Sequence, residues 1–516
     1  MMNWEKFATF LLKNGVVPFE QRIFMILAKD EDSINIKELK QFISNRGILS
    51  DDPRLKSLYS DLDGHELINC EDFKNIIDNN IQILKKIFTN DLVITKFKYF
   101  TDKIYEIWNK TKNMNGGHVA DYIPQLARVN PDQYGVSFCS IDGQRYSVGD
   151  TKTDFSAQSC CKPINYGIVL NDIGSDKVHE YVGREPSGQA FNELSLNKEG
   201  KPHNPLINSG AIMTTALIKG SSSSSERFEY INKIWGDLSG NIYKIGFNNP
   251  VYLSEKDTAD RNFALAYFMK ETNSKKKVGF PEGTNLKDTL ELYFQCCSIE
   301  VNCEIMSIVA ATLANNGINP LTGNQIWSSD TVKNILSMMM TCGMYDYSGE
   351  FAFKIGLPAK SGVAGAIMTV VPNVMGICTW SPKLDDIGNS FKGIEFYKLF
   401  AEIFDFHTFG NSDSSILTNI YNNSKQYEFY ELNLSASKGD LDHIKHLYLK
   451  GVNMNQSDYD GRTPLHLSVC ENKYNVADFL VNIAKVALVK DRWDRTPYDD
   501  AITTNDSKML ELFKMI

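Results

Sequence analysis

A serine and a lysine three positions apart are the residues of this chain best suited to chemistry. They occur in the run Ser159-Cys160-Cys161-Lys162, just before an apolar helical segment, and Lys360-Ser361-Gly362 follows far downstream. Residues three apart on a helix share one face, so the lysine amine can take the serine proton if the start of the helix is buried. The spacing therefore predicts a nucleophilic serine activated by a neighbouring amine.

The pairing of the two motifs is more specific than either motif alone. A bare S-x-x-K also fits an exposed lysine on a helix that has a serine near its N-cap. A later K-[ST]-G that leads into a strand is how serine β-lactamases and penicillin-binding proteins flank their acylation site from a sheet edge. Lys162 is a credible base if its ammonium is partly desolvated, and backbone N–H groups of Ser159 and of the Lys360–Val363 turn could stabilise an oxyanion.

Short strands are predicted on both sides of a long helical region. Gly135–Cys139 and Gln144–Gly149 are β-like runs separated by Asp142-Gly143, a strong hairpin signal. Strands are expected again at Phe351–Ile355 and after Lys360. We therefore expect an α/β domain whose sheet is built from early and late strands, with the active site where they meet.

Two further patterns belong to this domain. Ser298–Asn316 has helical spacing and ends at Gly317, as a C-terminal cap would. Val363–Trp380 is the most apolar stretch, but Pro372-Asn373 interrupts it, so we interpret it as two buried strands around a turn and not as a membrane span.

The front of the chain has the pattern of a helical domain. Apolar residues recur at helical spacing from Trp4 to about Asn109, beginning with Phe7, Phe10 and Leu11. Asp61-Leu62-Asp63-Gly64 resembles the start of a calcium loop, but its glycine comes early and the twelfth position is Asp72 instead of glutamate. We interpret this region as a degenerate helix-loop-helix that binds no metal.

The end of the chain has the pattern of ankyrin repeats. Asn411–Gln426 is a linker rich in Asn and Ser, and beyond it Thr463-Pro464-Leu465-His466 and Thr496-Pro497 recur at the ankyrin period of about 33 residues. Ala436–Asp440 supplies the helical half of a preceding unit. His466 is expected to cap backbone in the repeat turn, and the repeats could bind a partner protein.

Composition excludes some classes of partner. The chain has 516 residues, a net charge of -9 and a pI near 5.5, which argues against a nucleic-acid or anionic-membrane binder. Ten scattered cysteines without zinc spacing favour a reducing compartment. No presequence is visible at Met1-Met2-Asn3, so we expect an intracellular protein, mitochondrial or cytoplasmic.

Several motifs occur in an order that resembles a known family. They are Tyr122-Ile123-Pro124-Gln125-Leu126, Asp150-Thr151, Gln158-Ser159, Lys162-Pro163, Gly183-Arg184-Glu185-Pro186-Ser187-Gly188, His203-Asn204-Pro205, Asn208-Ser209-Gly210-Ala211, Asp260-Arg261-Asn262, Gly343-Met344-Tyr345-Asp346 and Ala359-Lys360-Ser361-Gly362-Val363. The chain is similar to the glutaminase family over nearly its whole length, and within it to the animal kidney-type and liver-type members.

The resemblance implies hydrolysis of L-glutamine to L-glutamate and ammonia on a serine β-lactamase-like fold. It implies a helical domain at 1–112, a catalytic domain at 118–410, a linker at 411–426 and ankyrin repeats at 427–516. The implied catalytic residues are Ser159 as nucleophile, Lys162 as its activator, Tyr345 as proton shuttle and Tyr293 bonded near the serine. The implied substrate-binding residues are Tyr122, Ser159, Asn208, Glu255, Asn262, Tyr293, Tyr345 and the Val363 backbone.

The resemblance also carries expectations about regulation. Family members are homotetramers, dimers of dimers, with inorganic phosphate as activator and no other cofactor or metal. A gating loop near the site corresponds to Glu193, Leu194, Ser195, Leu196 and Asn197. Ser195 stands where many animal members carry phenylalanine, and Phe268 replaces a tyrosine of the dimer-contact helix.

Three alternatives stay open at this point. The main base could be Lys162 or Tyr345, and Tyr293 lies in an apolar stretch where core packing competes with a role in the site. The enzyme could be a β-lactamase or esterase that acts on other acyl groups, although a carboxylate such as Glu255 suits the ammonium of an amino acid. A catalytically inactive scaffold that assembles partners through its repeats is the third interpretation.

Overall fold

The computed structural model describes residues 19–28, 33–78, 81–189, 192–276, 279–410, 425–504 and 506–514. The predicted helical residues Trp4, Phe7, Phe10 and Leu11 lie outside these ranges, as does most of the predicted linker. The chain forms two compact units. Unit 1 joins the N-terminal segment to the C-terminal repeats, and unit 2 comprises Gly47–Pro53 and Lys96–Leu417.

Unit 2 is built on a five-stranded antiparallel sheet of order β4-β3-β10-β9-β8. The strands are β3 (Gly135–Ser140), β4 (Arg145–Gly149), β8 (Ala359–Gly362), β9 (Ala366–Val371) and β10 (Met375–Trp380). β10 pairs with β3 along its whole length, from Met375 opposite Ser140 to Trp380 opposite Gly135. The expectation that early and late segments share one sheet is therefore confirmed.

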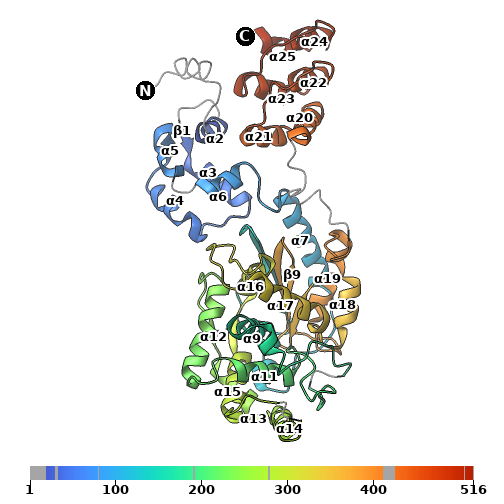
Figure 1. Cartoon of the computed structure of the whole chain (residues 1–516). Helices are drawn as coiled ribbons and strands as arrows, with labels where there is room; N and C mark the ends of the chain where they lie inside the picture. Colours follow the sequence, from blue (N-terminus) through green and yellow to red (C-terminus); the bar gives the residue numbers. More distant parts are fainter. Residues whose placement is uncertain are drawn as a thin grey trace. The chain divides into compact units, whose positions relative to one another are not determined.

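Helices cover both faces of this sheet (Figure 1). Cys139 packs with Ile308 and Ala311 of α16 (Cys303–Ala314), while its neighbour Phe138 packs edge-on against Phe100 of α7 (Phe97–Lys112). Successive strand residues point to opposite faces, so α16 and α7 lie on opposite sides. α19 (Phe391–Ile403) packs against α7 on the second side.

A cluster of helices beside the sheet forms the rest of the core of unit 2. It contains α9 (Cys161–Ile173), α11 (Asn208–Leu217), α12 (Ser224–Leu238), α13 (Asn249–Asp257), α14 (Asp260–Lys276), α15 (Leu286–Cys297), α17 (Ser329–Cys342) and the short α8 (Pro124–Ala127) and α10 (Ser175–Val178). A small sheet of order β5-β7-β6 joins β5 (Phe155–Ser156), β7 (Ile299–Val301) and β6 (Gly246–Phe247). The predicted α/β class is confirmed, and its sheet is antiparallel and flanked by this helical cluster.

Two turns were predicted correctly from their residues. β3 and β4 form a hairpin in which Gly143 adopts φ +83° and donates its N–H to the Ser140 carbonyl. β9 and β10 form the second hairpin, and Asn373 takes φ +61° at its turn. Both strands of that second hairpin are buried, as expected for Val363–Trp380.

Two element predictions were wrong. Phe351–Ile355 is not a strand, because Ser348–Lys354 forms α18 and buries Phe351 on one face. The helix predicted over Ser298–Asn316 begins only at Cys303, because β-branched Ile299 and Val301 pair as β7 and Asn302 caps the N–H of Ile305. Its end is as predicted, since the Gly317 N–H closes the helix on the Thr312 carbonyl.

The N-terminal part of unit 1 is a set of short helices around one small sheet. The helices are α2 (Phe19–Ala28), α3 (Ile36–Asn45), α4 (Lys56–Asp61), α5 (Cys70–Asp78) and α6 (Ile81–Phe88). β1 (Ser33–Asn35) and β2 (Leu67–Asn69) pair antiparallel between them. In the predicted loop, Asn69 accepts the N–H of Asp72 and donates to its carboxylate, so Asp72 is engaged in capping α5. Within the described residues, no cluster of His, Cys, Asp and Glu is placed to hold a metal ion.

The C-terminal part of unit 1 is a stack of helix pairs. It contains α20 (Lys425–Lys438), α21 (Leu441–Lys450), α22 (Pro464–Cys470), α23 (Tyr474–Asp478), a π-helical turn (Phe479–Ile483), α24 (Pro497–Thr504) and α25 (Ser507–Lys514). His466 accepts the N–H of Thr463 at 3.1 Å, which confirms its predicted capping role. Among the described residues, the helices are too short or too polar to cross a membrane.

Candidate active site

Ser159 lies where the small sheet passes into the helical cluster. β5 ends at Ser156, Gln158–Cys160 form a 3-10 turn, and α9 begins at Cys161. Gln158 adopts φ +46°, a left-handed conformation that is uncommon outside glycine and marks sites held by their surroundings. Ser159 is half-buried, so its hydroxyl is held at a defined place and can still be reached.

Lys162 lies one turn further along α9 and is completely buried. Its Nζ donates to the Asn208 carbonyl oxygen at 2.6 Å, and the Asn208 amide donates to Asn262 Oδ1 at 3.1 Å. Burial lowers the pKa of Lys162, because the neutral amine loses less hydration free energy than the ammonium when it leaves water. Three helices, α9, α11 and α14, thus bring together a lysine and two predicted substrate-binding amides.

The edge strand β8 lies beside the turn that carries Ser159. The Cys160 thiol donates to the Lys360 carbonyl at 3.4 Å, and Gly362 lies against Ala157 and Cys160. Lys360 is buried, and its ammonium donates to the Ser361 carbonyl at 2.7 Å. The two sequence motifs therefore meet in space, as their pairing predicted.

Tyr345 faces this edge from the turn that follows α17. Its backbone has φ +52°, and the Lys360 ammonium lies 4.7 Å from the centre of its ring. Burial raises the pKa of Tyr345, and contact with the Ser159 side chain offsets part of that effect. Burial also lowers the pKa of Lys360 to about 7, and repulsion from Lys162 adds to the shift. The turn needs Gly343, since a Cβ there would collide with the Ala359 carbonyl.

Glu255 is the carboxylate of the site. It projects from α13, is buried, and accepts hydrogen bonds from the Tyr122 hydroxyl at 2.7 Å and from the Gln158 amide at 2.9 Å. Burial raises the pKa of Glu255, while these two donors and the charge of Lys162 work in the opposite direction. Gln158 also donates to Ser156 Oγ at 3.3 Å, so the residue before the serine fixes the position of the carboxylate.

Tyr293 and Val363 complete the predicted set. Tyr293 is buried on α15 within the large core of unit 2, and its nearest charged or ionisable neighbours include Glu255 and Tyr122. It therefore packs in the core and also borders the site, so the two interpretations of this residue are both compatible with its position. Val363 is half-buried in the turn after β8 and packs against the same core.

The predicted gating loop belongs to a longer excursion between α10 and α11. Its base is closed by hydrogen bonds from Gly183 N to the Pro202 carbonyl and from Glu185 N to the His203 carbonyl. Within the loop, Asn197 accepts the N–H of Lys201 at 2.9 Å, Leu196 packs against the core and Leu194 is exposed. Ser195 donates its N–H to the Glu193 carbonyl at 2.9 Å, so this part of the loop is closed by its own backbone.

Two residues of the site had no assigned role before the structure. Gln158 joins Tyr122, Ser156 and Glu255, and its place next to Ser159 in the motif was the only signal. Lys360 belonged to a recognised motif, but its position over the Tyr345 ring depends on the path of β8. A cavity of about 360 Å³ also opens at Tyr345, lined by Pro186–Gln189, Asn204, Leu206 and Ile207 among others.

Comparison with protein families matches three parts of the chain. The family model described as glutaminase matches residues 117–409, that of ankyrin repeats (3 copies) matches 432–515, and that of an EF-hand domain matches 19–95.

Individual proteins agree with these matches. The liver isoform of glutaminase from Rattus norvegicus, described as mitochondrial, is 42% identical over 97% of this chain and 84% of its own length. Putative glutaminase 2 from Caenorhabditis elegans is 43% identical over 93% of this chain and 82% of its own length. The solved structure of the probable glutaminase ybaS is 34% identical, with a TM-score of 0.56 over 60% of this chain and 98% of that one.

Proposed function

Because this chain belongs to the glutaminase family and hydrolyses L-glutamine to L-glutamate and ammonia, we propose that the reaction proceeds through an acyl-enzyme on Ser159. In the first half, Ser159 Oγ attacks the side-chain amide carbonyl of glutamine as its proton passes to the Lys162 amine. The C–N bond then breaks, the proton is returned to the departing nitrogen, and ammonia leaves. Water attacks the ester in the second half, which releases glutamate and restores the serine.

The observation that carries this proposal is the buried Lys162 beside the serine turn. A lysine in water is protonated at neutral pH and cannot accept a proton, whereas burial lowers the pKa of Lys162 and raises the share of neutral amine. The oxyanion would be stabilised by the N–H groups of Ser159 and Val363, each donor contributing roughly 3 kcal/mol.

Tyr345 suits the role of proton donor better than that of base. Burial raises the pKa of Tyr345, so its phenol keeps the proton at neutral pH and can give it to the leaving nitrogen. Lys162 has the opposite shift, which favours it as the group that accepts the serine proton. We therefore propose Lys162 as the base and Tyr345 as the proton donor.

The substrate would be held by groups that match a zwitterionic amino acid. Glu255 is positioned by Tyr122 and Gln158 to receive the ammonium, because its carboxylate is buried and can pair with a cation. Asn208 and Asn262 supply neutral donors for the substrate carboxylate, while the Tyr122 hydroxyl donates to Glu255. A β-lactam or simple ester has no ammonium to satisfy Glu255, which argues against the alternative acyl substrates.

Ammonia release from glutamine tests this proposal directly. The full chain should release ammonia, and Ser159→Ala should abolish release while leaving the thermal unfolding curve unchanged. Ser337→Ala, on the exposed face of α17, is the matched control, because it removes an equivalent hydroxyl that bonds only the Lys333 carbonyl and lies outside the cavity at Tyr345. Undiminished release by Ser159→Ala would refute the acyl-enzyme.

The repeats support a second activity, the binding of a partner protein. Tyr459 is almost fully exposed at one repeat turn and Trp493 is half-exposed at the next, where ankyrin repeats present contact residues. Full-length chain as bait should retain a partner that Trp493→Ala loses. Equal recovery by both baits would argue against a contact at these turns.

Assembly and location are proposed from the relatives. We expect a tetramer, activation by inorganic phosphate without any other cofactor, and a mitochondrial location like that in the name of the rat liver relative. All ten cysteines are free, which agrees with a reducing compartment. Light scattering tests the tetramer, ammonia release with and without phosphate tests the activation, and fractionation of cells that express the chain tests the location.

A further inference from the structure

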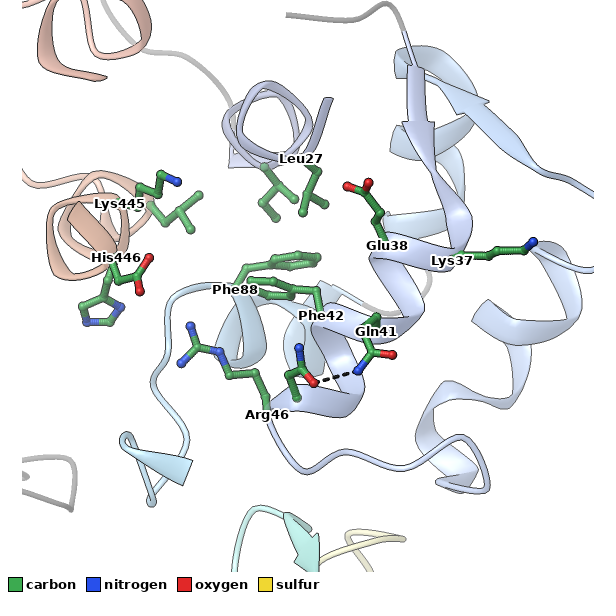
Figure 2. Close-up of a pocket in the computed structure, with 13 residues that line it drawn as sticks. Leu27, Lys37, Glu38, Gln41, Phe42, Arg46, Phe88, Lys445 and His446 are labelled. Atoms are coloured by element: carbon green, nitrogen blue, oxygen red, sulfur yellow. Dashed lines mark hydrogen bonds between the residues drawn. The ribbon is translucent and has the colours of Figure 1, made fainter. Parts of the chain in front are cut away.

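A cavity of about 550 Å³ lies within unit 1, far in sequence from the residues of the active site (Figure 2). Its walls come from α2, α3, α6 and α21, so both the N-terminal helices and the first helix pair of the repeats contribute. The volume is in the range of small-molecule sites, roughly 300–1,000 Å³. The glutaminase reaction uses none of these residues.

One wall of this cavity is apolar and aromatic. Phe42 and Phe88 stack with ring centres 5.3 Å apart and planes inclined by 16°. Leu27 faces the two rings from α2, and Figure 2 shows the three side chains gathered in the middle of the cavity. Leu449 of α21 adds a further aliphatic surface. Such a wall favours a ligand with a ring or chain of carbon.

Cationic groups surround this wall. Lys445 reaches from α21 toward the side of the cavity formed by α2 (Figure 2), and within the described ranges its ammonium has no hydrogen bond or ion pair. Lys37 on α3 also lines the cavity, and Figure 2 shows its ammonium directed away from the two rings. The Arg46 guanidinium lies 5.4 Å from the Phe42 ring centre. Glu38 and Asp442 are the acidic residues among the lining side chains, so the cations outnumber them.

His446 adds a polar group that lacks a partner. Its Nδ1 is buried and makes no hydrogen bond within the described residues. Burial lowers the pKa of His446 to about 3, and the charges of Lys450, His443 and Arg46 add to the shift. The imidazole is therefore neutral at physiological pH, and a buried polar atom of this kind usually has a partner in the occupied site.

We propose that this cavity binds a small amphipathic organic anion, with its apolar body against Phe42 and Phe88 and its anionic group near Lys445. An apolar ligand without charge would leave the Lys445 ammonium without a partner, and a small inorganic anion would leave the aromatic wall in water. The ligand would contact α21 and the N-terminal helices at once, so its binding would also raise the unfolding temperature of unit 1.

Two fluorescent probes separate the two parts of this proposal. The probes are 1-anilinonaphthalene-8-sulfonate, an aromatic anion, and N-phenyl-1-naphthylamine, its uncharged counterpart. Titration of the full chain should show one saturable site per chain for the anion and roughly tenfold weaker binding of the neutral probe. Calorimetry with dodecanoate then tells whether a chain of carbon is accepted as well as a ring.

Variants locate the site. Leu27→Trp should abolish binding of the anionic probe by filling the cavity, and Lys445→Glu should weaken it roughly tenfold. Lys485→Glu, an exposed lysine of the repeats outside the cavity, is the matched control and should bind as the wild type does. Circular dichroism melts check that each variant is folded.

The outcomes decide the proposal without reference to glutamine hydrolysis. Binding of the anionic probe that survives Leu27→Trp places the site elsewhere and overturns the proposal. Equal affinity for the charged and neutral probes, together with no effect of Lys445→Glu, overturns the requirement for an anion. Absence of saturable binding of either probe and of dodecanoate overturns the cavity as a ligand site.

Discussion

Lysines line both the candidate active site of unit 2 and the cavity of unit 1, and the two sets differ in how deeply they are buried. In unit 2, Lys162 and Lys360 are buried at 0% and 1% exposure, and burial lowers the pKa of both. In unit 1, Lys445 is half-buried and Lys37 is exposed at the rim of the cavity. A desolvated amine can accept a proton, whereas a hydrated ammonium offers a fixed positive charge. The comparison teaches that burial, and not residue type, separates a lysine suited to accept a proton from a lysine suited to attract an anion.

The largest effect is expected from removing the buried amine. Lys162→Met should lower kcat/KM by roughly 10²–10⁴-fold, because the serine loses its general base, while the fold is retained. In the wild type, kcat/KM should rise with pH as Lys162 loses its proton and should level off below the ordinary lysine pKa of 10.5, because burial lowers the pKa of Lys162. Ammonia release across pH measures both. The control Lys485→Met should have the kcat/KM of the wild type. A Lys162→Met enzyme with the wild-type kcat/KM would show that Lys162 is not the base.

Removing the Tyr345 hydroxyl should cost less than removing Lys162. Tyr345→Phe should reduce kcat by roughly 10²-fold, because the leaving nitrogen loses its proton donor. The rise of kcat/KM at low pH should keep its midpoint, since Lys162 is intact in this variant. A pH profile in which this rise disappears would instead make Tyr345 the base. Tyr347→Phe in the same turn is the control for a lost phenol outside the site.

A smaller effect is expected from neutralising the carboxylate of the site. Glu255→Gln should raise KM for glutamine roughly tenfold or more with a lesser change in kcat, because an amide cannot pair with the substrate ammonium. Burial raises the pKa of Glu255, so in the wild type KM should rise as pH falls through that value and the carboxylate becomes protonated. Steady-state kinetics across pH measure this effect. The rise of KM at low pH should disappear in Glu255→Gln. It should persist in the control Glu291→Gln, which removes a carboxylate that pairs with Lys256.

The smallest effect concerns stability at the cavity of unit 1. Lys445→Met should change the free energy of unfolding by no more than about 0.5 kcal/mol, because a half-exposed lysine without a partner holds little in place. Urea denaturation of the full chain measures this. A loss of unfolding free energy well above about 0.5 kcal/mol would show that Lys445 stabilises the fold. Lys445 would then no longer differ from the buried lysines in the way proposed.

Local sequence patterns correctly predicted the turns and caps whose conformation depends on a few neighbouring residues. Asp142-Gly143 and Pro372-Asn373 specify tight turns through backbone preferences, and the structure has hairpins at both. Thr463 and His466 form their cap within one repeat, so the repeat period alone located it. Ser159 and Lys162 were found because three-residue spacing fixes their relation on a helix.

The predictions that failed concern segments whose partners are distant in sequence. Phe351–Ile355 has enough aromatic and apolar residues for a strand, but β9 takes β8 as its neighbour and leaves this segment helical. Ile299–Val301 has a helical context, yet β5 and β6 pair with it from both sides. The intrinsic helix or strand propensity of a segment predicts little in such cases, because strand pairing and side-chain packing contribute more to its conformation.

The sequence on its own predicted a nucleophilic serine with a neighbouring lysine, and it determined the repeat architecture and the families to which parts of the chain belong, because these depend on short motifs and their order. Only the tertiary structure decided that Lys162 is buried, that Lys360 lies over the Tyr345 ring, and that Gln158 connects Tyr122 to Glu255. It also decided that helices from the two ends of the chain enclose one cavity. The physical reason is that the protonation state of a side chain and its ability to bind depend on how far its neighbours shield it from water. That shielding is set by three-dimensional packing.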